Sequence, residues 1–442
     1  ADAPAVGGTL KVVGSNTLNY FITLDPSSND NDTYTLDDVC GPNYDGDTDN
    51  GMECRGADSS QEFTRQRDKF LNALVEMDAD VYGLMELENN AAANPAGDGN
   101  DPVLEDIVDG LNALVGAGTY DFIDTGTLGN DAIKVGLIYK VATVTPVGDY
   151  AVLDSSVDPL FDTSRNRPAL AQTFEEIATG GQLTVVVNHF KSKGSACGAG
   201  DDEVDTSGGN CNGTRTDAAT ALVNWLATDP TGSGDPDFLV LGDLNSYAKE
   251  DPIDVFINAG YVDLAAEYNT DPYSYSFEGE WGYLDYALAN EWNVNADEPI
   301  VLDYNTEFKT AGQISSFYST DPFRWSDHDP ILVGFDLDVP DTTPPDTTIT
   351  DFPPDPSASN SGTFKYTSTE GGNQFECQFD GGGWTDCDDG QLTFSGLTEG
   401  SHTFEVRAID AANNVDPTPD SYTWVIDTTA PNTTITSTPD DP

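Results

Sequence analysis

Five strand-like segments in the first part of this chain end in, or lead into, side chains that bind metals or carry protons. They are Lys11–Asn16, Asp80–Glu86, Leu183–His189, Asp237–Asn245 and Trp325–Pro330. Short apolar runs of this kind predict buried strands. Open α/β sheets build their sites where the ends of several strands meet at one edge. The pattern therefore predicts an α/β fold with one site assembled from several strand ends.

The side chains at these ends favour metal-assisted cleavage of a phosphate ester. Oxygen ligands, which suit a hard cation such as Mg²⁺, come from Asn16, Glu86, Asp243 and Asn245. His189 and His328, two of only three histidines in the chain, can transfer protons near neutral pH. A divalent ion neutralises charge on the phosphate, and a histidine protonates the departing oxygen or activates water.

Each motif taken alone has a simpler explanation. Asp243 and Asn245 are ordinary turn residues after a strand. Ser326–Pro330 on its own reads as a loop with a capping Asp, and His189 as a structural histidine. The joint pattern favours a site, because all five segments end in compatible chemistry and the scarce histidines lie among them.

Nine stretches, in family order across Thr9 to Asp338, resemble the endonuclease/exonuclease/phosphatase superfamily and, within it, the large secreted bacterial nucleases. They are Ser15–Phe21, Cys54–Ala57, Asp80–Asn90, Ile133–Tyr139, Arg165–Pro168, Asn188–Gly194, Gly242–Ser246, Trp281–Tyr286 and Ser326–Pro330. Ser15 departs from the pattern, which usually has an aromatic or large apolar residue there. It adjoins a ligand position, so the departure concerns packing more than chemistry.

The resemblance implies a role for each site residue. The metal-site residues that it implies are Asn16, Glu86 and Asp327. The catalytic residues that it implies are His189, Asp243, Asn245, Asp285 and His328. Asp243 and Asn245 would orient the nucleophilic water and the phosphate, and His328 would move a proton while Asp285 holds its ring. The expected cofactor is Mg²⁺ or Mn²⁺, with Ca²⁺ open as a structural ion.

Four cations near the motifs are candidates for binding substrate phosphate: Arg165, Arg167, Lys191 and Lys193. A solvated-surface role for them is almost as well supported.

The formal net charge of −61 and the pI near 4.1 suit a polyanionic substrate poorly. All but two of the 17 basic residues precede Val339, however, so positive charge is concentrated with the motifs. An acidic surface also suits strong salt, where screening shortens to about 3 Å at 1 M.

Six cysteines form three close pairs in the sequence: Cys40 with Cys54, Cys197 with Cys211, and Cys377 with Cys387. No pair has Cys-x-x-Cys spacing, and no set of histidines lies near any pair. Both observations argue against a zinc site. Local disulfides formed in an oxidising compartment are the preferred interpretation. Together with the resemblance, they predict a secreted or cell-surface protein, with Ala1 as a processed start and no membrane-spanning run.

A repeat marks a second region of the chain. Asp341–Thr350 recurs as Asp427–Thr436, an offset of 427 − 341 = 86 residues, and a period of that size fits tandem β-sandwich modules. Alternating segments separated by Gly-rich turns lie between the copies, and the region resembles bacterial Ig-like repeats. We expect it to act as a spacer or stalk, with His402 structural. The second copy is cut short at Pro442, so we expect a fragment of a longer polypeptide.

Helical periodicity over 60–76, 102–115 and 214–227 alternates with the predicted strands, which indicates an α/β fold. The resemblance implies a four-layer α/β sandwich, in which helices flank two packed mixed sheets, followed by an all-β Ig-like sandwich. We predict a catalytic domain at 1–338, a linker at 339–346, the Ig-like sandwich at 347–427, and a truncated second repeat at 428–442.

Three functions remain open from the sequence. The first is a secreted, monomeric, divalent-metal-dependent endonuclease acting on DNA, with RNA as an open alternative. The second is a phosphomonoesterase or phospholipid phosphodiesterase on the same scaffold; we find no clear aromatic hairpin of the kind expected in lipid-cleaving relatives. The third is an adhesive surface protein whose nuclease-like domain is degenerate. Every motif position holds a residue that can perform its expected chemistry, which argues against this third function.

Overall fold

The computed structural model describes residues 6–24, 39–40, 52–57, 59–89, 101–198, 200–203, 208–269, 271–290, 294–301, 319–337, 343–369, 374–410 and 413–437. Contacts divide the chain into two compact units, Ala1–Val339 and Pro340–Pro442. Within the described residues, no helix is both long and apolar enough to cross a membrane.

Two six-stranded mixed sheets form the centre of the first unit. The first has the order β17 (Val294–Val301), β18 (Ile331–Leu337), β1 (Leu10–Tyr20), β4 (Val81–Glu88), β6 (Ile133–Lys140), β5 (Tyr120–Phe122). The second has the order β13 (Tyr261–Asp263), β16 (Asp285–Asn290), β12 (Phe238–Asp243), β9 (Gln182–His189), β8 (Ala169–Glu176), β7 (Val144–Leu153). Each sheet has one parallel pair at its centre, β1 with β4 and β9 with β12.

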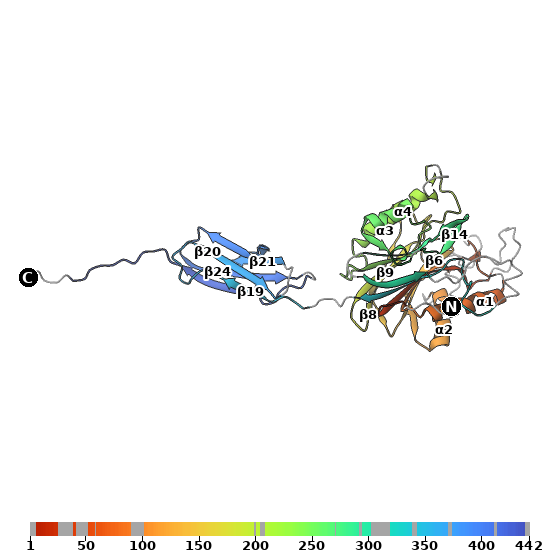
Figure 1. Ribbon diagram of the computed structural model, residues 1–442, viewed down its shortest axis with the longest axis horizontal. Helices are drawn as coiled ribbons and strands as arrows, with labels where there is room; N and C mark the ends of the chain where they lie inside the picture. The colour runs from red at the N-terminus through yellow and green to blue at the C-terminus, as the bar shows by residue number, and fades with distance from the viewer. Residues whose placement is uncertain are drawn as a thin grey trace, which may run out of the picture. The chain divides into compact units, whose positions relative to one another are not determined.

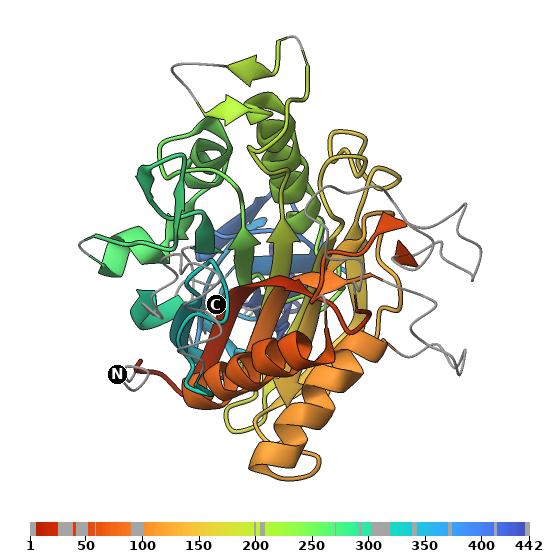
Figure 2. The same ribbon diagram turned by 90° about the vertical axis from the view of Figure 1, so that its right-hand side faces the viewer.

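Helices cover the outer faces of the two sheets, which confirms the four-layer α/β sandwich (Figure 2). The helices are α1 (Ser60–Met77), α2 (Pro102–Val115), α3 (Asn212–Leu226), α4 (Asp251–Asn258) and α5 (Leu264–Tyr268). The Ser59 hydroxyl accepts a hydrogen bond from the Glu62 amide and so caps α1. Asp101 caps α2 in the same way, just before Pro102.

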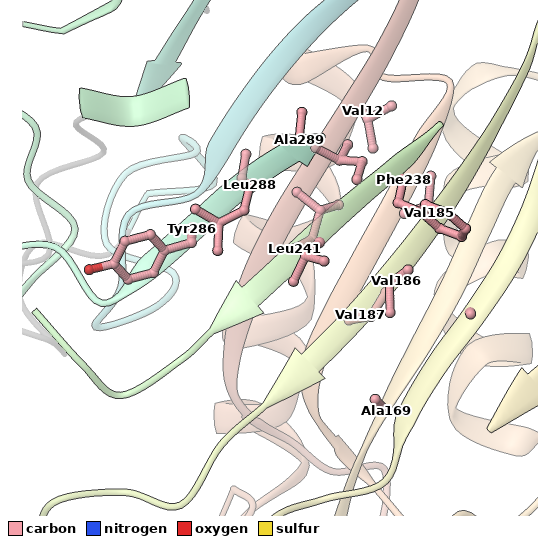
Figure 3. Packing of buried hydrophobic residues seen from close by; sticks show 14 of the residues in the cluster. Val12, Ala169, Val185, Val186, Val187, Phe238, Leu241, Tyr286, Leu288 and Ala289 are labelled. Atoms are coloured by element: carbon pink, nitrogen blue, oxygen red, sulfur yellow. The ribbon is translucent and has the colours of Figure 1, made fainter. Parts of the chain in front are cut away.

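Strand periodicity decides which side chains join which core. On β1, Val12 belongs to the core between the sheets, whereas the next residue, Val13, packs under α1 and α2. Val187 and Leu241 of the second sheet lie in the same inter-sheet core as Val12 (Figure 3). Because both sheets are buried on both faces, their central strands are almost continuously apolar, as the sequence shows.

Gly242, at the end of β12, allows β12 and β9 to approach closely. Its φ is +138°, and a Cβ there would lie 1.9 Å from the carbonyl oxygen of Asn188. We predict that Gly242→Ala lowers the free energy of unfolding by at least about 4 kcal/mol or prevents folding. Chemical denaturation measures this, with Gly260→Ala (φ +92°, open space) as a control costing about 1–2 kcal/mol. Equal effects would contradict the steric explanation.

The second unit is all-β, as expected from the sequence (Figure 1). Its three-stranded sheet has the order β19 (Thr347–Asp351), β20 (Ser361–Ser368), β23 (Gln391–Ser395). Its four-stranded sheet has the order β22 (Thr385–Asp386), β21 (Gln374–Phe379), β24 (Gly400–Ile409), β25 (Asp420–Ile426). Phe364 from the first sheet stacks on Phe404 from the second at 4.4 Å and contacts Trp424 at 5.0 Å between ring centroids. These rings join the sheets into a sandwich.

Two of the three predicted disulfides are present, Cys197–Cys211 and Cys377–Cys387. Cys54 is also disulfide-bonded, but the side chain of its expected partner, Cys40, lies outside the described residues. Cys197–Cys211 closes the loop after β9 onto the start of α3, and Cys377–Cys387 joins β21 to the residue after β22.

His402 is buried in the second unit, where its Nδ1 lies 2.8 Å from Asp380. This hydrogen bond and the Thr398 carbonyl raise the pKa of His402 above its usual value. The stabilisation is therefore complete below about pH 6.5 and is lost as pH rises through the raised pKa. Because Asp380 is partly exposed, we predict a loss of under about 1 kcal/mol. Amide hydrogen exchange of β24 measures it, and Asp380→Asn should remove the pH dependence.

Candidate active site

The register of the second sheet places three predicted catalytic residues in one row. Asp243 at the end of β12 pairs with His189 on β9 in a parallel ladder. Asp243 also pairs with Asp285 on β16 in an antiparallel ladder. Adjacent strands lie about 4.8 Å apart, so the three backbones stand side by side at one edge of the sheet. All three side chains are almost completely buried.

The first sheet contributes Asn16 and Glu86 from neighbouring strands. Asn16 on β1 pairs with Met85 on β4, and the register shifts just beyond both residues. Glu86 lies at this irregularity with φ of +62°, a left-handed conformation that costs a non-glycine residue about 1–3 kcal/mol. The bulge turns Glu86 toward the second sheet. Backbone strain of this kind is typical of functional sites.

These side chains converge on one oxygen, Oδ2 of Asp243. The amide Nδ2 of Asn16 lies 3.4 Å from it and 3.2 Å from Oε1 of Glu86. Nε2 of His189 lies 3.7 Å from Asp243 Oδ2 and 3.9 Å from Glu86. Nε2 of His328 approaches the same oxygen at 3.9 Å. The two imidazoles therefore flank one carboxylate.

His328 is oriented from several sides. Its Nδ1 lies 2.7 Å from Oδ2 of Asp285, and the ring of Tyr275 stacks on the imidazole at 4.3 Å. Ser274 ties the neighbouring segments together, because its hydroxyl accepts the Asp285 amide and its carbonyl accepts the Asp329 amide. Nε2 of His328 is thus directed into the site.

The two histidines have opposite charge preferences. Burial alone would lower the pKa of His328, but the carboxylates of Asp285 and Asp243 outweigh it and raise that pKa well above its usual value. Burial lowers the pKa of His189 well below its usual value, and the positive charges of Arg167 and His328 add to this effect. At neutral pH His328 is therefore a proton donor and His189 a neutral acceptor.

The remaining predicted residues line the same site. Burial raises the pKa of Asp243 to about 7, despite the opposing effect of His328, and its Oδ1 accepts the Asn245 amide at 2.8 Å. Asn245 has a φ of +48° and donates its side-chain amide to the Phe190 carbonyl. Asp327 is half-buried, and burial raises its pKa, which the charge of Glu86 raises further.

The donor set fits a hard divalent ion. Among the described residues there is no group of three or more His, Cys, Asp or Glu side chains arranged to hold a metal ion. Mg²⁺ does not need one, since it keeps several waters and takes one or two carboxylates. Asn16 donates a 3.2 Å hydrogen bond from Nδ2 to Oε1 of Glu86, so the two side chains are neighbours, and Asp327 lies near Glu86. The ligands that the pair offers are the amide oxygen of Asn16 and the carboxylate of Glu86. Asn16 and Glu86 would hold the ion.

The predicted phosphate-binding cations divide into two groups. Lys193 lies over the ring of Tyr247 and forms an ion pair with Glu250, so its charge is neutralised. Lys191 donates to Ser195 and carries no carboxylate contact within hydrogen-bond reach among the described residues. Arg167 donates its backbone amide to the His189 carbonyl and lies 3.1 Å from Asp131. Arg165 is exposed beside it.

Sequence reasoning missed several parts of this region. Tyr275 and Ser274 position His328, and Arg55 reaches the Asp131 carboxylate that also contacts Arg167. Ring stacking and ion pairs between distant segments leave no local pattern in a sequence. The aromatic hairpin not found in the sequence is also present: it consists of β14 (Tyr275–Phe277) and β15 (Glu280–Gly282). On it, Trp281 stacks on Tyr273 with 68% of its surface exposed.

Residues 50–328 match the model of the endonuclease/exonuclease/phosphatase family, more than half of the chain. The chain belongs to this family. Members of the endonuclease/exonuclease/phosphatase family hydrolyse phosphodiester or phosphoester bonds, so the first unit is a hydrolase domain. Asn16, Glu86 and Asp243 are in contact within that domain, and Asp327 lies near Glu86.

Solved structures similar to this chain include the human Nocturnin catalytic domain with bound sulfate, at 14% identity and a TM-score of 0.44, covering 76% of this chain and 96% of that one. A mannosyl-6-phosphatase from Bacteroides thetaiotaomicron has 14% identity and a TM-score of 0.44, covering 74% and 99%. D. rerio TDP2 complexed with a single-strand DNA product has 12% identity and a TM-score of 0.42, covering 74% and 99%. The curated proteins gave no match.

Proposed function

We propose that the chain is a secreted, divalent-metal-dependent nuclease that hydrolyses phosphodiester bonds of DNA, with RNA as the alternative nucleic-acid substrate. The observation that carries the proposal is the pair of histidines that flank Asp243, of which His328 favours the protonated form and His189 the neutral form. A phosphodiester needs both a base for the attacking water and an acid for the leaving oxygen, which this arrangement supplies.

In this mechanism, neutral His189 accepts a proton from the attacking water while Asp243 and Asn245 hold the water and the phosphate in line. The water oxygen forms a bond to phosphorus, and the bond to the leaving oxygen breaks. His328 donates its Nε2 proton to that oxygen, and Asp285 stabilises the charged ring throughout. The divalent ion, when bound, neutralises charge on the phosphate oxygens.

A lipid phosphodiester is the second candidate substrate, because Trp281 is exposed on a hairpin whose other face contacts His328. Two features disfavour it. Glu278 and Glu280 flank the hairpin turn and are exposed, so the tip carries negative charge that anionic lipid surfaces repel. One exposed tryptophan also buries little apolar area in a membrane compared with a full amphipathic face.

A panel of substrates tests the proposal. The purified chain is incubated in Mg²⁺ with plasmid DNA, RNA, p-nitrophenyl phosphate and phosphatidylcholine vesicles. We expect nicking and linearisation of the plasmid, with little release of p-nitrophenol and no released headgroup. Release of headgroup or of p-nitrophenol without any cleavage of nucleic acid would contradict the assignment as a nuclease.

A further inference from the structure

Four cations gather on the His189 side of the site: Arg55, Arg165, Arg167 and Lys191. The carboxylate of Asp131 lies among them, 3.1 Å from Nε of Arg167 and 3.6 Å from a terminal nitrogen of Arg55. Arg167 and Lys191 are 9% and 8% exposed, so they are largely removed from solvent. Arg55 has 43% of its side chain exposed and faces water as well as Asp131.

This concentration of positive charge is unfavourable without an anion. The chain has a formal net charge of −61, with 78 acidic residues available for 17 basic ones, yet one carboxylate bridges two arginines here. Burial lowers the pKa of Lys191, and the neighbouring Arg167 and Arg165 lower it further. Partly desolvated, under-neutralised cations are typical of sites that receive an anionic ligand, and guanidinium groups suit phosphate oxygens.

The cluster lies to one side of the catalytic row. The sheet order runs from β16 with Asp285, through β12 with Asp243 and β9 with His189, to β8. Arg167 precedes β8 and donates its amide to the His189 carbonyl, so it stands one strand beyond His189. Two strand spacings, about 10 Å, separate its backbone from that of Asp243. Because Arg55 and Arg167 contact the same carboxylate of Asp131, Arg55 lies with Arg167 on this side of His189.

We propose that Arg55 and Arg167, aligned by Asp131, bind the phosphate next to the scissile one on the same strand. This inference rests on the proposed nuclease function and makes the substrate an oligonucleotide or polynucleotide rather than an ester with a single phosphate. Asp131 is a positioning residue, since it holds both guanidinium groups and leaves their remaining N–H groups for the substrate. Arg55 adds specificity for chains of phosphates.

The test combines Arg55→Gln with oligonucleotides that contain one internal cleavable bond. In each oligonucleotide, one phosphate flanking that bond is replaced by an uncharged methylphosphonate. We expect Arg55→Gln to lower kcat/KM on the all-phosphate substrate by roughly 10- to 100-fold, the range for a charge-assisted hydrogen bond. In one of these oligonucleotides, the methylphosphonate replaces the phosphate that Arg55 binds. On that substrate Arg55→Gln should change kcat/KM by less than about threefold, because the contact between Arg55 and the phosphate is already absent.

Controls separate this inference from the proposed function. Lys11→Gln removes an equal charge near the start of β1, where Lys11 contacts Asp78, and should leave the rate unchanged. Arg55→Lys keeps the positive charge but removes the planar guanidinium group, so its kcat/KM should lie between that of Arg55→Gln and that of the parent. Thermal unfolding confirms that each variant is folded. Failure of the parent to cleave any nucleic acid would contradict the nuclease function itself.

Two results with an active parent would overturn the inference alone. One is an equal loss for Arg55→Gln on a dinucleotide with a single phosphate, which would place Arg55 at the scissile phosphate. The other is an unchanged rate for Arg55→Gln on every substrate. Support would also come from salt dependence, since losing one phosphate contact should reduce the slope of log binding constant against log salt by about 1.

Discussion

His328→Ala should slow phosphodiester cleavage by roughly 10²–10⁴-fold, the usual effect of losing a general acid or base. The substitution removes the proton donor that faces Asp243 and the positive charge that Asp285 and Asp243 stabilise. Initial rates on plasmid DNA at saturating Mg²⁺ measure the loss, and circular dichroism confirms that the variant is folded. Activity equal to that of the parent at matched metal concentration would remove the mechanism proposed here.

Two companion variants show whether the effect belongs to chemistry. Asp285→Asn keeps the ring of His328 but removes its anionic partner, so we expect a smaller loss that is still substantial. His402→Ala removes the one histidine of the second unit and should leave the rate unchanged. A loss for His402→Ala as large as that for His328→Ala would indicate a general effect on the protein.

The site could be predicted from the sequence to the extent that it depends on local pattern. Apolar runs locate β1, β4, β9 and β12, and the polar residues that follow them mark one edge. Helical periodicity locates α1, α2 and α3 to within two residues. The row of His189, Asp243 and Asp285 then follows from strand pairing, which the sequence suggests but does not specify.

Features that depend on tertiary context could not be predicted. The left-handed conformation of Glu86 arises from a register shift between paired strands, and the local sequence contains no turn-forming residue that would predict it. The opposite charge preferences of His189 and His328 come from burial and from the residues that surround each ring. Arg55 meets Asp131 only because separate segments converge in the fold.

Removing divalent ions should abolish cleavage, with a loss of roughly 10³-fold or more, because the ion supplies several kcal/mol of transition-state stabilisation. The residues that would hold it offer no substitute: Asn16 is neutral, and Glu86 is an anion that repels the phosphate. The arginines of the cationic cluster lie beyond His189 and cannot replace an ion at Glu86. Treatment with excess chelator, followed by addition of Mg²⁺ or Mn²⁺, measures the loss and its recovery.

The most direct test of a metal-assisted phosphodiesterase site is the rate of cleavage of one defined phosphodiester bond as Mg²⁺ is titrated into metal-depleted protein. We predict a negligible rate without the ion, saturation as it is added, and a much higher Mg²⁺ requirement for Glu86→Gln than for the parent. Glu62→Gln, an exposed change on α1, serves as the matched control and should follow the parent curve. Full cleavage in excess chelator, or identical Mg²⁺ curves for Glu86→Gln and the parent, would contradict the account.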